Sequence, residues 1–440
     1  MIPKRQPRGA TIEVREMKIK MFLNLLALVL LVGSFASAED SETILHNFSG
    51  GSSNQPAAGL IADSHGNLFG VTGVYGVNCG AICGTVFELS PTSSGWTYST
   101  IYGFKGGVDG SAPQASLLLG LDGNLYGTTS TGGGKCKFQV GGCGTVFKLS
   151  PNSSGGWTET VLHRFSTTTD GALPFTPLVQ DASGNLYGGT DFAGLVSPDC
   201  PQGCGTIFEL SPNGSNWTFS VIHTFTGGAD GAFGSGLLLD ASGNLYGGTG
   251  GGGIANSRCG GEGCGIVFKM TPNAAGWTKS TLDTFTGGSD GFDVLNLIFD
   301  ASGNIFGATL FAGHGDNTLC APLGCGTIFE LSPSGSAWTF KVIHDYIGAD
   351  GVNPSGIVFD SAGNLYGATE RGGPSCCGTI FKLVPDGSGN WTQDILFAFT
   401  GGTDGNFPPG PPVVDASGNL FGVTGNGGTT GAGVAFELTP

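Results

Sequence analysis

Residues 240–249 read DASGNLYGGT, and near copies of this string recur about every 60 residues along the chain. Each copy leads into a segment resembling C-G-T-[VI]-F-[EK]-L-S-P, then into W-T-x-x-x-[VIL]-H-x-F, and then into G-G-x-D-G. A fixed repeat period of this length is typical of solenoids, propellers and arrays. The repeat period alone therefore predicts one of these repeat architectures.

Every copy contains strand-like runs separated by turn residues. In the fourth copy these runs lie at residues 236–239, 245–249, 266–270 and 277–285. Gly, Asn and Asp fill the turn between the first two runs, and Thr271-Pro272 is expected to end the third. Four short antiparallel strands without helical spacing predict one propeller blade per copy.

The strand count predicts how the ring closes. The N-L-Y-G strand and the G-T-V-F strand each occur seven times, but the W-T strand follows only six of them. Residues 42–48, ETILHNF, match the tail of the missing strand. We therefore predict an all-β, seven-bladed β-propeller with four antiparallel strands per blade, whose last blade is closed by the N-terminal strand and is shared between residues 39–50 and 405–440.

Residues 1–38 have a different character from the rest. A basic stretch precedes an apolar run at residues 21–32 and then Ala36-Ser37-Ala38, which is typical of a secretory signal peptide with an A-x-A cleavage site. A retained anchor is the alternative, although about 15 apolar residues are fewer than the ~20 that span a bilayer. We expect residues 39–440 to form a single secreted domain without a membrane span, extracellular, periplasmic or attached to the cell surface.

The net charge restricts the possible partners. Removal of residues 1–38 leaves 11 Lys and Arg against 31 Asp and Glu, a formal charge of −20. Such a surface repels phosphate backbones, so nucleic acid is not expected as a partner. We expect a monomer that meets an extracellular glycan or protein.

Twelve cysteines fall in six local pairs at one point of the repeat. Local disulfides are the favoured interpretation for an exported protein, and zinc is the alternative, although each pair stands in a different blade. The adjacent cysteines of the sixth copy would form a vicinal disulfide. The pairs are Cys79/Cys83, Cys136/Cys143, Cys200/Cys204, Cys259/Cys264, Cys320/Cys325 and Cys376/Cys377.

The whole repeat resembles that of the GloVer repeat family of exported bacterial proteins. Its first hairpin, as in residues 356–366, is also similar to that of NHL-type propellers. The resemblance covers essentially all of residues 39–440 and implies export and a repeat fold, without an established activity.

An aspartate recurs in the G-G-x-D-G loops, which should share one face of the propeller with the cysteine loops. The functional interpretation is a ring of carboxylates that holds calcium or binds sugar hydroxyls. The structural interpretation, which we favour, is that each aspartate fixes its own turn, so no cofactor is expected and calcium is the alternative. The residues are Asp109, Asp170, Asp230, Asp290, Asp350 and Asp404.

A catalytic site should break the repeat, because chemistry needs different residues in different blades. After the second-strand threonine, only the third and sixth copies carry a carboxylate, Asp191 and Glu370, and Arg371 follows the latter. His314 and Asp316 are a further irregularity in the fifth cysteine loop. An acid/base pair for sugar chemistry is conceivable, but no nucleophile is evident.

Three functions remain open at this point. A binding module on the cysteine-loop face is favoured over a propeller-type polysaccharide hydrolase or lyase. A structural component of an extracellular matrix is the third possibility.

Overall fold

The computed structural model describes residues 41–49, 55–73, 83–136, 141–166, 169–198, 200–313, 320 and 322–439. The predicted signal peptide and cleavage site, Cys79, His314 and Asp316 lie outside the described residues. The described residues fall within one compact unit, Asp40–Pro440. None of the helices in the described part is long and apolar enough to cross a membrane.

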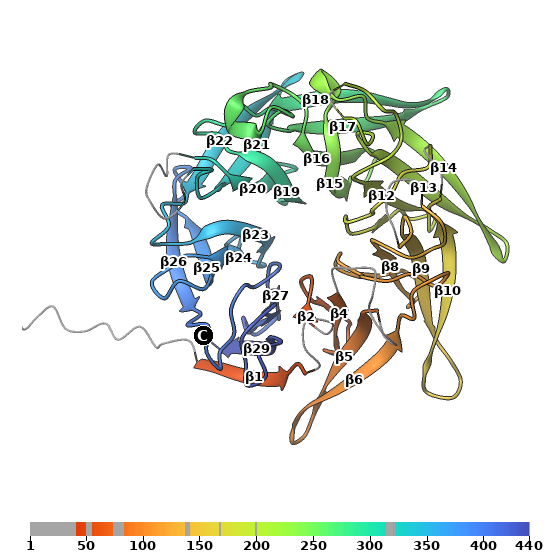
Figure 1. Cartoon of the computed structure of the whole chain (residues 1–440). Coiled ribbons are helices and arrows are strands. Elements are labelled where there is room, and N and C mark those ends of the chain that lie inside the picture. Colours follow the sequence, from red (N-terminus) through yellow and green to blue (C-terminus); the bar gives the residue numbers. More distant parts are fainter. Residues whose placement is uncertain are drawn as a thin grey trace, which may run out of the picture. The chain divides into compact units, whose positions relative to one another are not determined.

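Seven antiparallel sheets are arranged in a ring around a central opening, so the predicted seven-bladed β-propeller is confirmed (Figure 1). The only helices among the described residues are the short 3-10 turns η2 (Gly228–Asp230) and η3 (Ser257–Cys259). The strands of blade 1 are β2 (Gln55–Pro56), β3 (Ile61–Ala62), β4 (Leu68–Gly73), β5 (Thr85–Thr92) and β6 (Gly95–Gly103); of blade 2, β7 (Leu118–Leu119), β8 (Leu125–Thr129), β9 (Thr145–Pro151) and β10 (Trp157–Arg164); of blade 3, β11 (Val179–Gln180), β12 (Leu186–Thr190), β13 (Thr206–Asn213) and β14 (Asn216–Thr224); and of blade 4, β15 (Ala232–Leu239), β16 (Leu245–Gly251), β17 (Ile266–Asn273) and β18 (Gly276–Thr284). Blade 5 has β19 (Phe292–Phe299), β20 (Ile305–Phe311), β21 (Thr327–Ser334) and β22 (Ala337–Asp345); blade 6 has β23 (Val352–Phe359), β24 (Leu365–Arg371), β25 (Thr379–Pro385) and β26 (Trp391–Ala398); and blade 7 has β27 (Val413–Val414), β28 (Leu420–Val423), β29 (Val434–Thr439) and, from the other end of the chain, β1 (Ser41–Asn47).

The seventh blade joins the two ends of the described chain. Strand β1 pairs antiparallel with β29, with Ile44 opposite Phe436 and Ser41 opposite Thr439. Figure 1 shows β1 on the outer side of β29, as the strand count predicted. Just beyond β1, the amide of Phe48 donates to the carbonyl of Gly433 at 3.0 Å. Each of the seven sheets in the described part of the chain thus contains at least four strands.

The core lies between neighbouring blades and explains the glycine of the N-L-Y-G strand. Phe268 of blade 4 is fully buried, and its ring lies 5.6 Å from that of Phe225, which ends blade 3. A Cβ added to Gly247 would come within 2.5 Å of the Phe268 ring, so only glycine leaves room for the phenylalanine of the next strand. Trp277 packs edge-on against Tyr187 of blade 3, at 5.9 Å between centroids.

Two predicted strand ends differ from the structure by more than two residues. Strand β15 begins at Ala232 rather than at residue 236. Its pairing with β16 shifts register between Ser235 and Leu237, so the residues before the shift do not continue the regular pattern of the residues after it. Strand β17 continues through Pro272, because β16 pairs no further than Met270 and the missing proline N–H therefore costs no hydrogen bond on that side.

Candidate binding site at the central cavity

The cysteine loops and the G-G-x-D-G loops lie on the same face of the ring. The amide of Gly253, in the cysteine loop of blade 4, donates to the carbonyl of Gly228 at 2.6 Å, in the G-G-x-D-G loop before that blade. On the other side, the amide of Asp293, at the start of blade 5, donates to the carbonyl of Cys264 at 3.3 Å. The cysteine loop of blade 4 is thereby held between the two loops that flank its blade.

Disulfides stiffen these loops in the way the spacing predicted. Five local pairs are bonded, Cys136–Cys143, Cys200–Cys204, Cys259–Cys264, Cys320–Cys325 and the vicinal Cys376–Cys377. Cys83 is also disulfide-bonded, while its expected partner lies outside the described residues. The Cys259–Cys264 bridge packs against Gly287, where a Cβ would come within 2.5 Å of the Cys259 sulfur. The bridge and the next G-G-x-D-G loop therefore form one packed unit.

The repeated aspartates of that loop bind their own backbone. Asp290 accepts hydrogen bonds from the amide and hydroxyl of Thr286, both at 2.7 Å, and from the amide of Gly288 at 3.0 Å. Asp404 repeats this pattern with Thr400 and Gly402, and Asp109, Asp170 and Asp350 each accept one amide hydrogen bond from the same kind of loop. These contacts are those that the structural interpretation expects of an aspartate that fixes its own turn.

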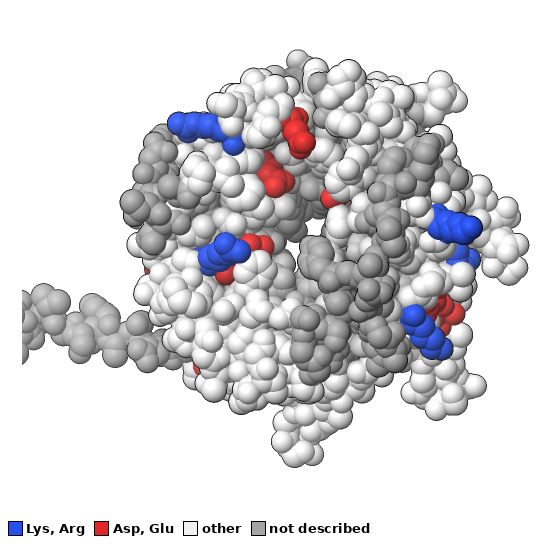
Figure 2. Space-filling view, in the orientation of Figure 1, with Lys and Arg blue, Asp and Glu red and all other residues white. Residues whose placement is uncertain are grey.

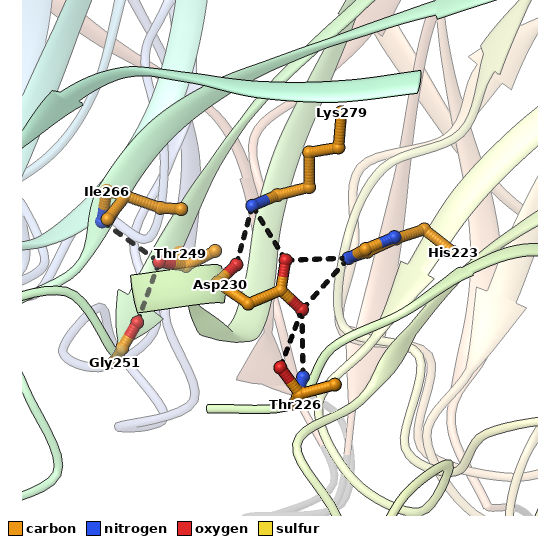
Figure 3. A network of polar contacts seen from close by, with 7 residues as sticks. All are labelled: His223, Thr226, Asp230, Thr249, Gly251, Ile266 and Lys279. Carbon is orange, nitrogen blue, oxygen red and sulfur yellow. Dashed lines mark hydrogen bonds and ion pairs between the residues drawn. The ribbon is translucent and has the colours of Figure 1, made fainter. Parts of the chain in front are cut away.

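Asp230 takes part in a network that includes residues of two blades. Its carboxylate lies 3.0 Å from the Lys279 ammonium of β18, 3.2 Å from His223 Nε2 of β14, and 2.9 Å from the Thr226 amide (Figure 3). Burial raises the pKa of Asp230, but the hydrogen bonds and charges of His223 and Lys279 outweigh it and hold that pKa well below its ordinary value. The carboxylate thus joins blade 3 to blade 4.

Histidines at the equivalent outer-strand position make similar contacts. His163 and His344 approach Asp170 and Asp350 at 3.4 Å and 3.2 Å, and His46 stacks on Tyr98 of blade 1 at 3.9 Å. Among the described residues, no three His, Cys, Asp or Glu side chains are grouped so that they could hold a metal ion.

The central opening contains a cavity of about 720 Å³, within the usual range of ligand pockets. Its walls come from the innermost strands of all seven blades or the segments that precede them, and from the ends of the second strands of blades 3 and 4. Asp191 and Asp293 are the only charged side chains among the described residues that line it. Figure 2 shows acidic side chains close to the edge of the central opening. The cavity therefore has one acidic wall and is otherwise neutral.

The two carboxyl groups come from different blades and line the same cavity. Asp191 follows β12 of blade 3, and Asp293 lies on β19 of blade 5 with a left-handed backbone (φ 63°). Between them stands Gly250 of blade 4, where a Cβ would come within 2.8 Å of Asp293 Oδ1. This glycine occupies the repeat position of Asp191, and its missing side chain makes room for Asp293.

Burial and mutual repulsion alter the protonation of this pair. Burial, together with the negative charge of Asp293, raises the pKa of Asp191 to about 8. Burial also raises the pKa of Asp293 to about 6. Neither carboxyl group forms a hydrogen bond to another described side chain that would offset the effect of burial on its pKa. Near pH 7 the pair therefore holds about one proton, so it can both donate and accept a hydrogen bond.

Glu370 lies elsewhere, so the structure does not place it with Asp191. Burial raises the pKa of Glu370 to about 7, against the opposing effects of Arg371 and a hydrogen bond with Asn353. The Arg371 guanidinium lies 5.7 Å from the centre of the Phe407 ring and borders a second hollow of about 380 Å³ with Asn353 and Cys376. Neither Glu370 nor Arg371 lines the central cavity.

Sequence reasoning missed Asp293, although a signal was present. The third residue after the G-G-x-D-G aspartate can be compared in six blades. It is phenylalanine in blades 4 and 7 and a different residue in each of the other four, and only blade 5 has an acid there. The residues are Ala112, Leu173, Phe233, Asp293, Asn353 and Phe407. All six have a positive φ between 54° and 63°, which directs each side chain differently from its extended neighbours.

The sequence profile of the Gloeobacter/Verrucomicrobia repeat matches residues 32–259 and 254–440. The chain belongs to this repeat family. The resemblance inferred from the repeated segments is thereby confirmed. No curated protein matches the sequence of this Gloeobacter/Verrucomicrobia repeat protein.

Solved structures similar to this Gloeobacter/Verrucomicrobia repeat protein share its fold at low identity. Two are extracellular domains from B. thetaiotaomicron, each described as part of a hybrid two component system. The first has a TM-score of 0.53 and 10% sequence identity, and the match covers 90% of this chain and 39% of that chain. The second has a TM-score of 0.51 and 14% sequence identity, and the match covers 91% of this chain and 41% of that chain. A third is a fungal alcohol oxidase of the AA5 family in complex with copper. It has a TM-score of 0.54 and 11% sequence identity, and the match covers 91% of this chain and 76% of that chain. This repeat protein spans about two fifths of the first two chains, and at these identities the likeness shows the fold alone.

Proposed function

We propose that this repeat protein is an extracellular binding module whose ligand enters the central cavity from the cysteine-loop face. The observation that carries the proposal is the Asp191–Asp293 pair, which interrupts the repeat inside a cavity of ligand size. Residues needed only by the scaffold recur in every blade, whereas these two acids do not. The loop disulfides agree with an oxidising compartment outside the cytoplasm.

A glycan suits the cavity better than a flat protein surface does. Uncharged polar side chains such as Gln114, Ser116 and Asn296 stand around the wall, beside the aromatic rings of Phe175 and Phe233. Amides and hydroxyls recognise sugar hydroxyls, and aromatic faces cover the apolar side of a sugar ring. A cavity also admits the end of a chain rather than a broad surface.

The test compares glycan-array and pull-down binding of three proteins: the unchanged chain, Gln114→Trp and Ala274→Trp. Gln114 lines the cavity, whereas Ala274 lies exposed in the turn between β17 and β18 on the opposite face, so the control adds the same side chain elsewhere. We expect Gln114→Trp alone to abolish binding. Retained binding by a folded Gln114→Trp protein would show that the cavity is not the site.

A polysaccharide hydrolase or lyase is the second candidate, and the divided pKa values of the acid pair favour it specifically. A protonated Asp191 is suited to act as general acid, and an ionised Asp293 as base or charge stabiliser. Asp191→Asn and Asp293→Asn should each abolish any polysaccharide cleavage that is found, whereas Glu370→Gln should not. Full cleavage by either asparagine variant would exclude this mechanism.

A further inference from the structure

The charge of the central cavity is entirely negative, and this restricts the ligand further. We propose that the cavity binds an amino sugar, a glycan unit whose free ammonium group is held between Asp191 and Asp293. This inference rests on the proposed function and adds the chemical class of the ligand.

The described walls of the cavity carry no cation to compensate the two acids. No Lys or Arg is among the described residues that line the cavity, and neither carboxyl group accepts a hydrogen bond from another described residue. A carboxylate removed from water without a partner is costly, and a cation from a ligand would replace the missing one. An ammonium group can donate to both carboxyl groups at once, because it has three N–H donors.

Two side-chain amides of the cavity wall, those of Asn296 and Gln114, can bind the uncharged part of the ligand. Asn296 Oδ1 accepts from the amide of Ile357 at 3.2 Å, which leaves the NH₂ group of Asn296 without a described partner. The Gln114 amide makes no hydrogen bond to another described residue. Both can bind hydroxyl groups, as an amino sugar requires and a simple alkylamine does not.

Ligand binding should be linked to the protonation of Asp191 and Asp293. The titratable groups that line the cavity in the described part are Asp191 and Asp293, and together they hold about one proton at pH 7. A bound ammonium group favours the ionised forms, so binding should release a fraction of that proton and strengthen between pH 5 and pH 7.

The two asparagine substitutions are suitable tests because they preserve shape. Blade 6 carries Asn353 at the repeat position of Asp293, with φ 58° against 63°, so the backbone accepts asparagine there. Asp394→Asn is the matched control, since Asp394 lies exposed on β26, away from the cavity, and its loss removes the same charge.

The experiment measures calorimetric binding of a glucosamine tetramer, its fully N-acetylated counterpart, a glucose tetramer and tetralysine. We expect the glucosamine tetramer to bind at least about tenfold more tightly than either neutral tetramer. Asp191→Asn and Asp293→Asn should each weaken it by at least about tenfold, and Asp394→Asn by less than about twofold. Because the amino groups of the sugar also titrate near pH 7, the test is the difference between proteins: titration in buffers of different ionisation enthalpy should show a smaller net release of protons, or a larger net uptake, for Asp191→Asn than for the unchanged protein.

Each other outcome overturns the amino-sugar assignment in a recognisable way. Equal binding of the neutral tetramers would show that hydroxyl groups suffice, and tighter binding of tetralysine would point to a protein ligand. Competition by calcium alone, without sugar binding, would identify a cation site. If none of the tetramers binds but Gln114→Trp still abolishes array binding, the amino-sugar assignment fails and the binding module stands; if Gln114→Trp leaves array binding intact, both fail.

Discussion

The Lys279 ammonium lies 3.0 Å from Asp230 Oδ1 and 2.7 Å from the Asp230 carbonyl oxygen, and thereby fastens the outer strand of blade 4 to the loop that enters it. Lys279→Met should lower the free energy of unfolding by about 1–3 kcal/mol, because it leaves the half-buried carboxylate with fewer partners. Urea unfolding followed by tryptophan fluorescence measures this.

The effect of Lys279→Met should depend on pH in a defined direction. The folded state holds the pKa of Asp230 below its ordinary value of 3.8, so the stabilisation is present above about pH 4 and is lost as the pH falls through the folded pKa. The difference in unfolding free energy between Lys279→Met and the unchanged protein should therefore shrink in acid. A difference that stays constant down to pH 2 would contradict this assignment.

Phe48 is predicted to stabilise the closure of the ring. Its side chain is fully buried, and its ring lies 5.1 Å from that of Phe87 and 5.8 Å from that of Tyr98, both in blade 1. Phe48→Ala should cost about 3–5 kcal/mol by cavity formation, whereas Thr43→Ala, at an exposed position of β1, should change stability by less than about 0.5 kcal/mol. Equal midpoints of urea unfolding for the two variants would argue against β1 as an essential part of the ring.

Removal of the Cys259–Cys264 bridge by a double change to serine should have a local effect. The bridge closes a loop with a sequence separation of 5, so the loss should be roughly 2 kcal/mol or less. Because the bridge packs on Gly287, amide hydrogen exchange should accelerate in the cysteine loop and also around Gly287. Exchange in blade 1 serves as the internal control, and acceleration there would mean that the bridge supports the whole ring.

Asp191→Asn should stabilise the ligand-free protein, increasingly so as the pH rises from 4 to 8. Burial raises the pKa of Asp191 from 3.8 to about 8, so the folded state takes up a proton that the unfolded chain lacks, and stability falls with pH across this range. Asparagine does not titrate, and at about 1.4 kcal/mol per pKa unit the gain at pH 8 should be on the order of 5 kcal/mol. Melting curves at several pH values measure it; parallel pH profiles of the two proteins would rule out a raised pKa.

Repetition made the fold predictable. The missing W-T strand at one end and ETILHNF at the other were enough to predict that Ile44 and Phe436 lie in one blade. The same repetition concealed the site. Asp293 has a left-handed backbone, lies against Gly250 and lines the same cavity as Asp191, and no local pattern of strands and turns reveals that acids of blades 3 and 5 share one cavity.

The sharing of blade 7 between β1 and β29 sets the order in which the protein can be completed. Ser41 and Thr439 are paired in space but lie at opposite ends of the described chain, so this contact has the largest loop-closure cost in the ring. During synthesis, blade 1 and the blades that follow can form while β1 still lacks its partner, and an unpaired strand edge is prone to pair with another chain. Protection against aggregation is therefore gained only when the last strand has emerged, and any factor that shields the growing chain is needed until then.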